Sequence, residues 1–159
     1  MYIHIYCTVT IESALKTNNF KNEVHKASLN ILYTAWCIKS ESNAVLKRYG
    51  LTQEQYNVLR ILKGSHPTSL CVKEIGSRMI ERSSNVPRII DKLVLKKLVK
   101  RTGSVVDKRE TVNTISDAGI ALLDASTKVL EVKWKNLFAL NEGDAKTLNA
   151  LIEKMRNGL

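Results

Sequence analysis

Polar side chains between residues 85 and 96 have the types and the spacing that contact with a nucleic acid requires. At 100° per residue of a helix, they share one arc, which consists of Asn85, Arg88, Lys92 and Lys96. Asparagine can bond adenine and arginine can bond guanine through paired hydrogen bonds, and lysine supplies charge to phosphates. A separate arc is apolar and consists of Val86, Ile89, Ile90 and Leu93. Such a helix buries one face and presents the other to a polyanion.

The positive charge of the chain is concentrated around this helix. The 159 residues contain 25 Lys and Arg against 15 Asp and Glu, a net charge of +10. Residues 82–110 hold nine of the basic and three of the acidic side chains, and so contribute six of the ten charges. An excess of this size favours a nucleic acid or a membrane surface as partner. The alternative is that these charged side chains only face solvent, but this would not explain the order of elements around the helix.

The elements that must position this helix begin near residue 52. Thr52 and Gln55 fit a capping box, in which each side chain bonds the other residue's backbone N–H and so begins a helix. The Gly-Ser-His-Pro sequence at 64–67 ends it. The spacing of apolar residues then predicts a short helix over about 71–79.

The charged helix and a hairpin complete the series. We expect Ser84 to be the N-cap, which places Pro87 at the third helical position, where its missing N–H has no partner to lose. The helix then continues to about Leu98. Residues 99–103 and 111–115 have β-type composition and predict a hairpin with a polar loop. Helix, short helix, turn, helix and hairpin are in the order of a winged helix-turn-helix.

Three further predicted helices, outside this series of elements, also carry apolar faces. A helix from about Phe20 to Lys47 is apolar nearly all round over 27–38, which predicts that a partner subunit covers one face. Ser116 caps a helix of about 117–139, and Asn141 begins a last helix with Asp144 at its third position. The first has a seam of Leu123, Leu130, Trp134 and Leu137, and the second has a stripe of Leu148, Leu151, Ile152 and Met155.

The composition argues against several classes of protein. No apolar run reaches the ~18 residues of a membrane span, and the first six residues lack the basic region of a secretory signal. The cysteines Cys7, Cys37 and Cys71 form no pair of metal-ligand spacing, and no nucleotide-binding or catalytic motif occurs. We therefore expect a cytoplasmic protein that is not an enzyme, does not bind a membrane and has no cofactor or metal.

The motifs in combination resemble one family. LTQEQYNVL at 51–59, SSNVPRIIDKL at 83–93, DKR at 107–109 and ISDAG at 115–119 are similar in order and spacing to the MarR family of bacterial transcription regulators. The resemblance covers roughly residues 20–157. It implies a mainly α fold with a small β-hairpin wing, and a homodimer. It also implies a domain plan: an N-terminal arm and short helix at 1–19, a winged helix-turn-helix DNA-binding domain at 51–116, and a helical dimerisation region formed by 20–50 and 117–159.

The resemblance also assigns the DNA-binding residues. In the family the recognition helix enters the major groove of double-stranded DNA and the wing reaches the minor groove. The recognition-helix positions are Ser83, Ser84, Asn85, Pro87 and Arg88, to which the charged arc adds Lys92. The wing positions are Asp107, Lys108 and Arg109. Asp107 either braces Arg109 by an ion pair, as in the family, or is a simple turn residue. The family function is a repressor at a pseudo-palindromic operator, relieved by a small aromatic or lipophilic effector or by an oxidative signal.

The chain departs from the family pattern at three places. Pro87 stands where Thr or Ser is common, which removes a hydroxyl from the reading face. Cys71 stands where Thr or Ser usually caps the short helix, and a thiol there is a candidate redox sensor. We favour the alternative that Cys71 is a small apolar filler. Residues 1–9 have no family counterpart. A rival function is a winged-helix protein–protein interaction module without specific DNA binding, which salt-dependent binding to duplex DNA would distinguish.

Overall fold

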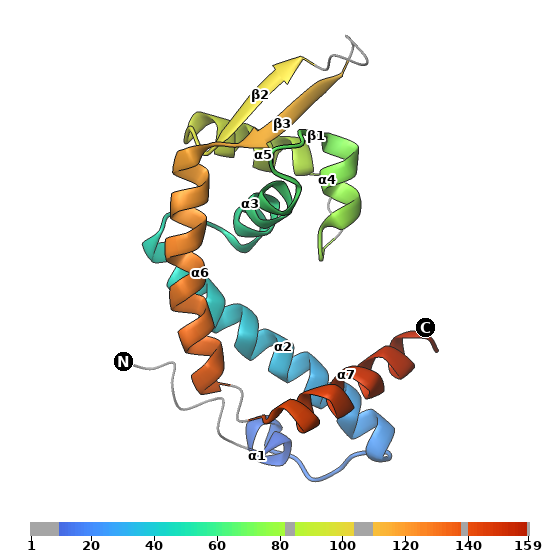
Figure 1. Ribbon diagram of the computed structural model, residues 1–159. Helices are drawn as coiled ribbons and strands as arrows, with labels where there is room; N and C mark the ends of the chain where they lie inside the picture. The colour runs from blue at the N-terminus through green and yellow to red at the C-terminus, as the bar shows by residue number, and fades with distance from the viewer. Residues whose placement is uncertain (1–9, 82–84, 104–109, 138–139, 159) are drawn as a thin grey trace.

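The computed structural model describes residues 10–81, 85–103, 110–137 and 140–158. These residues form a mainly helical fold with one small antiparallel sheet, as predicted (Figure 1). In chain order the elements are α1 (Ile11–Leu15), α2 (Glu23–Arg48), α3 (Gln53–Ser65), β1 (Leu70–Cys71), α4 (Val72–Arg78), α5 (Val86–Leu95), β2 (Val99–Gly103), β3 (Thr111–Ile115), α6 (Asp117–Leu137) and α7 (Glu142–Arg156).

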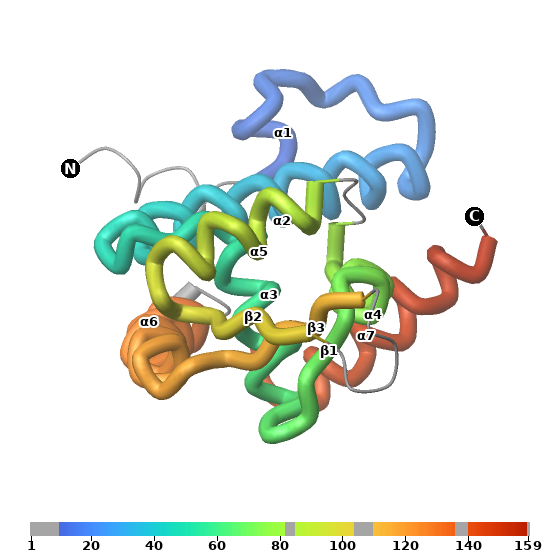
Figure 2. Tube along the Cα trace, turned by 90° about the horizontal axis from the view of Figure 1, so that it is seen from above, coloured from blue at the N-terminus to red at the C-terminus, as the bar shows by residue number. Residues whose placement is uncertain are grey.

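The molecule has a head and a base. The head contains α3, α4, α5 and the sheet, and α2 and α6 connect it to a base where α1 and α7 lie (Figure 1). Figure 2 looks onto the head and shows α5 beside β2. We call residues 51–116 the reading head from here on.

The turn from α2 to α3 is fixed by backbone hydrogen bonds. Gly50 has φ of 64°, a left-handed conformation that glycine adopts without strain. Its N–H donates to the Lys47 carbonyl and the Leu51 N–H donates to the Leu46 carbonyl, each at 3.1 Å. These two bonds form a Schellman motif, which ends α2 and reverses the chain direction.

The predicted capping box begins α3. The Gln55 N–H donates to Thr52 Oγ1 at 3.2 Å, and the Thr52 N–H donates to Gln55 Oε1 at 3.3 Å. Gln55 is only 3% exposed, so its side chain is held inside the junction between α2 and α3.

The start of α5 differs from the prediction by one residue. The N-cap is Asn85 and not Ser84, so Pro87 occupies the second helical position instead of the third. The first N–H groups of a helix have no intrahelical acceptor, and proline is therefore tolerated at either position. The one-residue shift leaves most of the predicted apolar arc buried, since Val86, Ile90 and Leu93 are at most 4% exposed, while Ile89 is only partly buried.

The end of α5 is also earlier than predicted. The helix stops at Leu95 because Lys97 adopts φ of 59°. The Lys97 N–H donates to the Val94 carbonyl at 2.8 Å, and the Leu98 N–H donates to the Leu93 carbonyl at 3.0 Å. This is a second Schellman motif, here with lysine at the left-handed position. It turns the chain sharply from α5 into β2.

The predicted hairpin has the predicted bounds. β2 and β3 pair antiparallel, with Val99 opposite Ile115 and Gly103 opposite Thr111. A strand that the sequence did not predict, β1, adds two residues to the other side of β3, which gives the strand order β1-β3-β2.

The start of α6 is tied to the turn that follows α5. Ser116 Oγ accepts from the Gly119 N–H at 3.0 Å, which confirms the predicted cap. The same hydroxyl donates to the Lys97 carbonyl at 2.8 Å, and the Ser116 N–H donates to the Leu98 carbonyl at 3.0 Å. Hydrogen bonds therefore join the end of β3, the start of α6 and the turn after α5.

Apolar side chains cover the base unevenly. In the seam of α6, Leu123 and Leu130 are at most 2% exposed. Within 27–38 of α2, by contrast, only Cys37 is buried, and α7 has no buried residue. The single chain therefore leaves the predicted stripes of α2 and α7 uncovered.

Candidate nucleic-acid interface

The exposed face of α5 carries three of the predicted DNA-binding residues. Asn85, Arg88 and Lys92 are all exposed, and with the start of α3 they line a groove of about 280 Å³. Within the described part of the chain, the side chains of Arg88 and Lys92 have no hydrogen-bond or ion-pair partner. Their charges are consequently free to meet an external anion. Pro87 is exposed beside them, at the second position of the helix.

The other predicted positions lie outside the described residues. Ser83 and Ser84 precede α5 in the sequence, and Asp107, Lys108 and Arg109 come between β2 and β3. The ion pair expected between Asp107 and Arg109 therefore stays a prediction.

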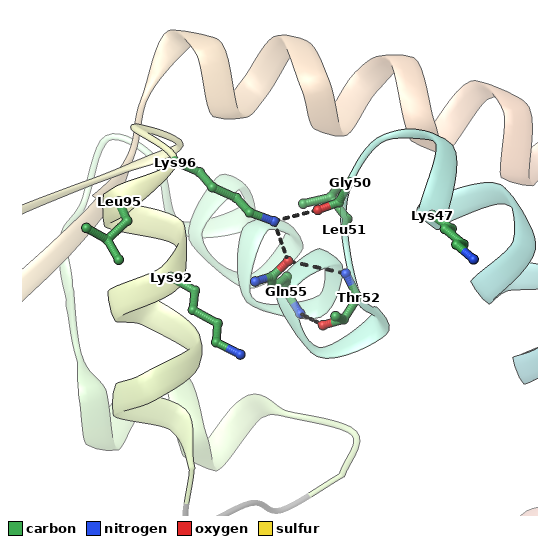
Figure 3. Close-up of a pocket in the computed structure, with 8 residues that line it drawn as sticks. All are labelled: Lys47, Gly50, Leu51, Thr52, Gln55, Lys92, Leu95 and Lys96. Carbon is green, nitrogen blue, oxygen red and sulfur yellow. Dashed lines mark hydrogen bonds between the residues drawn. The ribbon is translucent and has the colours of Figure 1, made fainter.

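Lys96 belongs to the charged arc, but its ammonium is hydrogen-bonded to other residues of the chain. Its ammonium donates to the Gly50 carbonyl and, at 3.1 Å, to Gln55 Oε1 (Figure 3). Lys96 is exposed with Asn85, Arg88 and Lys92, as the helical arc predicts, but its ammonium has partners within the chain. The helical arc predicted the direction of the side chain, but the α2–α3 turn that receives it comes from distant sequence.

A second groove lies beside this contact. It measures about 470 Å³, and the side chains of Lys47 and Lys92 also line it (Figure 3). Neither ammonium group has a hydrogen-bond or ion-pair partner among the residues that the structure describes. The basic surface of the head therefore extends from α5 to the end of α2.

A polar network that sequence reasoning missed holds the wing against α5. Arg101 of β2 forms an ion pair with Asp91 of α5 at 2.6 Å and donates through Nε to Asn113 Oδ1 at 3.3 Å. Asn113 of β3 is fully buried, and its amide group donates to the Leu70 carbonyl of β1 at 3.3 Å. One chain of contacts thus joins α5 to all three strands. The only signal in the sequence was an acidic residue within a basic helix and an Asn in a β-type run.

Cys71 is the N-cap residue of α4, as the prediction placed it. It is a free thiol of intermediate exposure. The Glu74 carboxylate accepts from the Cys71 N–H at 2.8 Å. This bond, together with one from the thiol, lowers the pKa of Glu74 from its ordinary value. Glu74 therefore supports the start of α4, and the redox role of Cys71 stays a prediction.

A crevice separates the head from α2 and α6. It measures about 660 Å³ and is largely apolar, with Ile38, Tyr56, Ile80 and Trp134 among its walls. At its rim, Lys39 of α2 pairs with Glu81, just before α5, at 2.7 Å. This ion pair raises the pKa of Lys39. The crevice is a cavity that the sequence did not reveal, because its walls come from separate helices.

Two kinds of feature are missing from the described ranges. No three His, Cys, Asp or Glu side chains there are grouped so that they could hold a metal ion. None of the helices there combines the length and the apolar character needed to cross a membrane.

Comparison with known proteins gives consistent matches. A family model described as the MarR family matches residues 51–111. The HTH-type transcriptional regulator MgrA of Staphylococcus aureus is 30% identical over 118 residues, which are 72% of this chain and 76% of MgrA. MhqR of Bacillus subtilis, also an HTH-type transcriptional regulator, is 32% identical over 89 residues, which are 55% of this chain and 59% of MhqR.

Solved structures agree with these matches in fold. Sco5413, a MarR family transcriptional regulator from Streptomyces coelicolor, has a TM-score of 0.74 at 26% identity, covering 86% of this chain and 94% of its own. S. aureus MepR, in a complex with DNA, has a TM-score of 0.74 at 22% identity, covering 83% and 97%.

Proposed function

The chain belongs to the MarR family of transcription regulators, and on that premise we propose that it binds double-stranded DNA sequence-specifically as a homodimeric repressor. A protein of this family regulates transcription and is not an enzyme. The observation that carries the proposal is the division of α5 into a buried apolar face and an exposed face of Asn85, Arg88 and Lys92. This face stands at one end of the molecule beside a two-stranded wing.

Each residue of the exposed face has a distinct role in this proposal. Asn85 and Arg88 read base edges in the major groove, because their side chains can form paired hydrogen bonds with adenine and guanine. Lys92 neutralises a phosphate. Ser83, Ser84 and Pro87 approach the same groove. Lys108 and Arg109, with Asp107 beside them, reach the neighbouring minor groove.

The exposed apolar surfaces of the base support the homodimer. Leu32 and Trp36 on α2 are 67% and 54% exposed, and Leu151 on α7 is 60% exposed. Large exposed apolar side chains on these helices are what an interaction surface of a soluble protein presents. A second copy that covers it would place residues 20–50 and 117–159 at the subunit interface and leave the reading head free. The two copies of α5 must then lie about one DNA turn apart, ~34–36 Å, which implies a pseudo-palindromic operator.

The crevice beneath the head is our candidate for the effector site. Its apolar walls suit a small aromatic or lipophilic molecule, and it lies between the head and the helices that carry it. A ligand there would change the angle of the head and so the separation of the two recognition helices. Affinity for an operator of fixed spacing would fall, and repression would be relieved. Oxidation of Cys71 is the alternative signal.

Fluorescence anisotropy tests the DNA-binding proposal. The purified protein is titrated against a duplex from upstream of its own gene and against a shuffled duplex, each at several salt concentrations. We expect the native duplex to bind at least ~10³-fold more tightly, with a steep salt dependence. Equal weak binding to both would contradict sequence-specific recognition at this site. No binding at any salt concentration would favour a protein partner instead.

A further inference from the structure

Lys96 connects the recognition helix to the junction between the base and the head. It lies at the C-cap of α5, and its ammonium donates to the Gly50 carbonyl and to Gln55 Oε1. We call these two hydrogen bonds the Lys96 bridge. Gly50 is the residue that ends α2, and Gln55 is part of the capping box that begins α3. One side chain thus joins three helices at the point where α2 leaves the head (Figure 3).

We propose that Lys96 is a positioning residue for DNA recognition, which fixes the angle between α5 and α2 and makes no contact with DNA itself. The inference deepens the proposed function and rests on it. Two of the three N–H bonds of the ammonium are already directed into the protein. Lys92, one helical turn earlier, has no such partner in the described residues. Two lysines four residues apart on one helix therefore have different roles.

The residues around the Lys96 bridge explain why it fixes the orientation of α5. Gln55 is nearly fully buried, and its amide oxygen also accepts the Thr52 N–H, so the acceptor cannot swing away. Hydrogen bonds donated by a charged group are stronger than neutral ones. At the other end, the Schellman motif at Lys97 fixes how the chain leaves α5. Lys96 is therefore held between two rigid turns, and α5 cannot pivot about its C-terminus without breaking the bridge.

The experiment compares Lys96→Met with Lys92→Met in the full-length protein. Both substitutions remove one charge from the same helix and keep much of the apolar stem, so they are matched in long-range electrostatics. We expect Lys96→Met to lower affinity for the specific duplex about 3- to 30-fold, the range of other mutations that alter coupling without touching the ligand. The slope of log affinity against log salt should stay as in the wild type. Lys92→Met should reduce that slope by about 0.9 for each phosphate that the variant no longer neutralises.

Two further readouts separate positioning from general destabilisation. Duplexes whose half-sites are one base pair closer or farther should be rejected less strongly by Lys96→Met, because α5 is free to pivot. Lys96→Arg should restore both affinity and spacing preference, since a guanidinium can donate to the same two carbonyls. A shallower salt slope in Lys96→Met, equal to that of Lys92→Met, would make Lys96 a phosphate contact and overturn the inference. Unchanged affinity and spacing preference would overturn it too.

A measurement without DNA keeps the inference testable if the wild type binds no duplex, a result that would sink the proposed function instead. The Thr52 N–H is bonded to the oxygen that Lys96 holds. Amide hydrogen exchange over residues 50–55 should therefore be faster in Lys96→Met than in the wild type, and unchanged in Lys92→Met. Equal exchange in all three proteins would mean that the bridge does not hold the junction, and the inference would be wrong.

Discussion

Replacing Gly119 by alanine tests the packing that joins the wing to α6. Gly119 lies in the first turn of α6, and a Cβ on it would stand 2.2 Å from the Leu98 carbonyl oxygen and 2.8 Å from Ile115 Cγ1. Ordinary contacts between carbon and a carbonyl oxygen are about 3.3–3.6 Å. The segments that contain Gly119 and Leu98 would therefore have to separate by about 1 Å. The Leu98 carbonyl cannot move alone, because it accepts the Ser116 N–H that begins the helix.

The expected change in the free energy of unfolding has three contributions. Overpacking of this kind costs about 1–3 kcal/mol of unfolding free energy. Weakening of the hydrogen bond from Ser116 to Leu98 costs about 1 kcal/mol more. Alanine in place of glycine within a helix returns about 1 kcal/mol. We expect Gly119→Ala to lower the free energy of unfolding by about 1–3 kcal/mol, which for a chain of this size is a drop in Tm of roughly 2–12 °C.

Gly64→Ala is the matched control. Gly64 lies in the last turn of α3, and a Cβ there meets nothing within 4 Å. The same chemical change should therefore raise stability by about 0.5–1 kcal/mol. Urea unfolding followed by circular dichroism measures both variants, at one protein concentration because subunit association contributes to stability. A Gly119→Ala protein as stable as Gly64→Ala would show that the head and α6 are not held together by this contact.

Further substitutions test the reading face, the polar network and the exposed base. Arg88→Ala should lose about 1–3 kcal/mol of discrimination between operator and shuffled duplex, and an equal loss on both in anisotropy would make Arg88 a phosphate contact. Asn113→Leu should destabilise the fold by about 1–3 kcal/mol in urea unfolding, because the buried Leu70 carbonyl loses its amide donor. An unchanged unfolding midpoint would mean that this hydrogen-bond network does not stabilise the fold. Leu151→Glu should shift the protein from dimer to monomer in sedimentation, since it places charge within an apolar interface. A dimer that survives would move the interface elsewhere.

Local signals predicted the helix boundaries where a cap and its partner are close in sequence. Thr52 with Gln55, and Asn141 with Asp144, form the expected capping boxes. The start of α5 was misplaced because three consecutive residues, 83–85, are all good N-caps. Burial of Val86 and Ile90 in the core is consistent with the observed register, and local capping rules do not include this burial.

The missed features depend on residues that meet only in three dimensions. β1 is two residues long and exists because β3 lies beside it, so it has no pattern of its own. Asn113 bonds Leu70 across 43 positions of sequence, and Lys96 bonds Gly50 across 46. Periodicity gave the side of the helix on which Lys96 lies. It did not give the turn that meets it there, and the crevice was missed for the same reason.

The separation of α5 into two faces has a consequence for how such a protein can diverge. Val86, Ile90 and Leu93 hold the helix in the core, whereas Arg88 and Lys92 support no other part of the described chain. Substitutions on the exposed face are expected to change stability by only about 0.5 kcal/mol or less. After a gene duplication, one copy could therefore acquire a new target sequence through single steps that all fold. The head that presents those residues would be inherited unchanged.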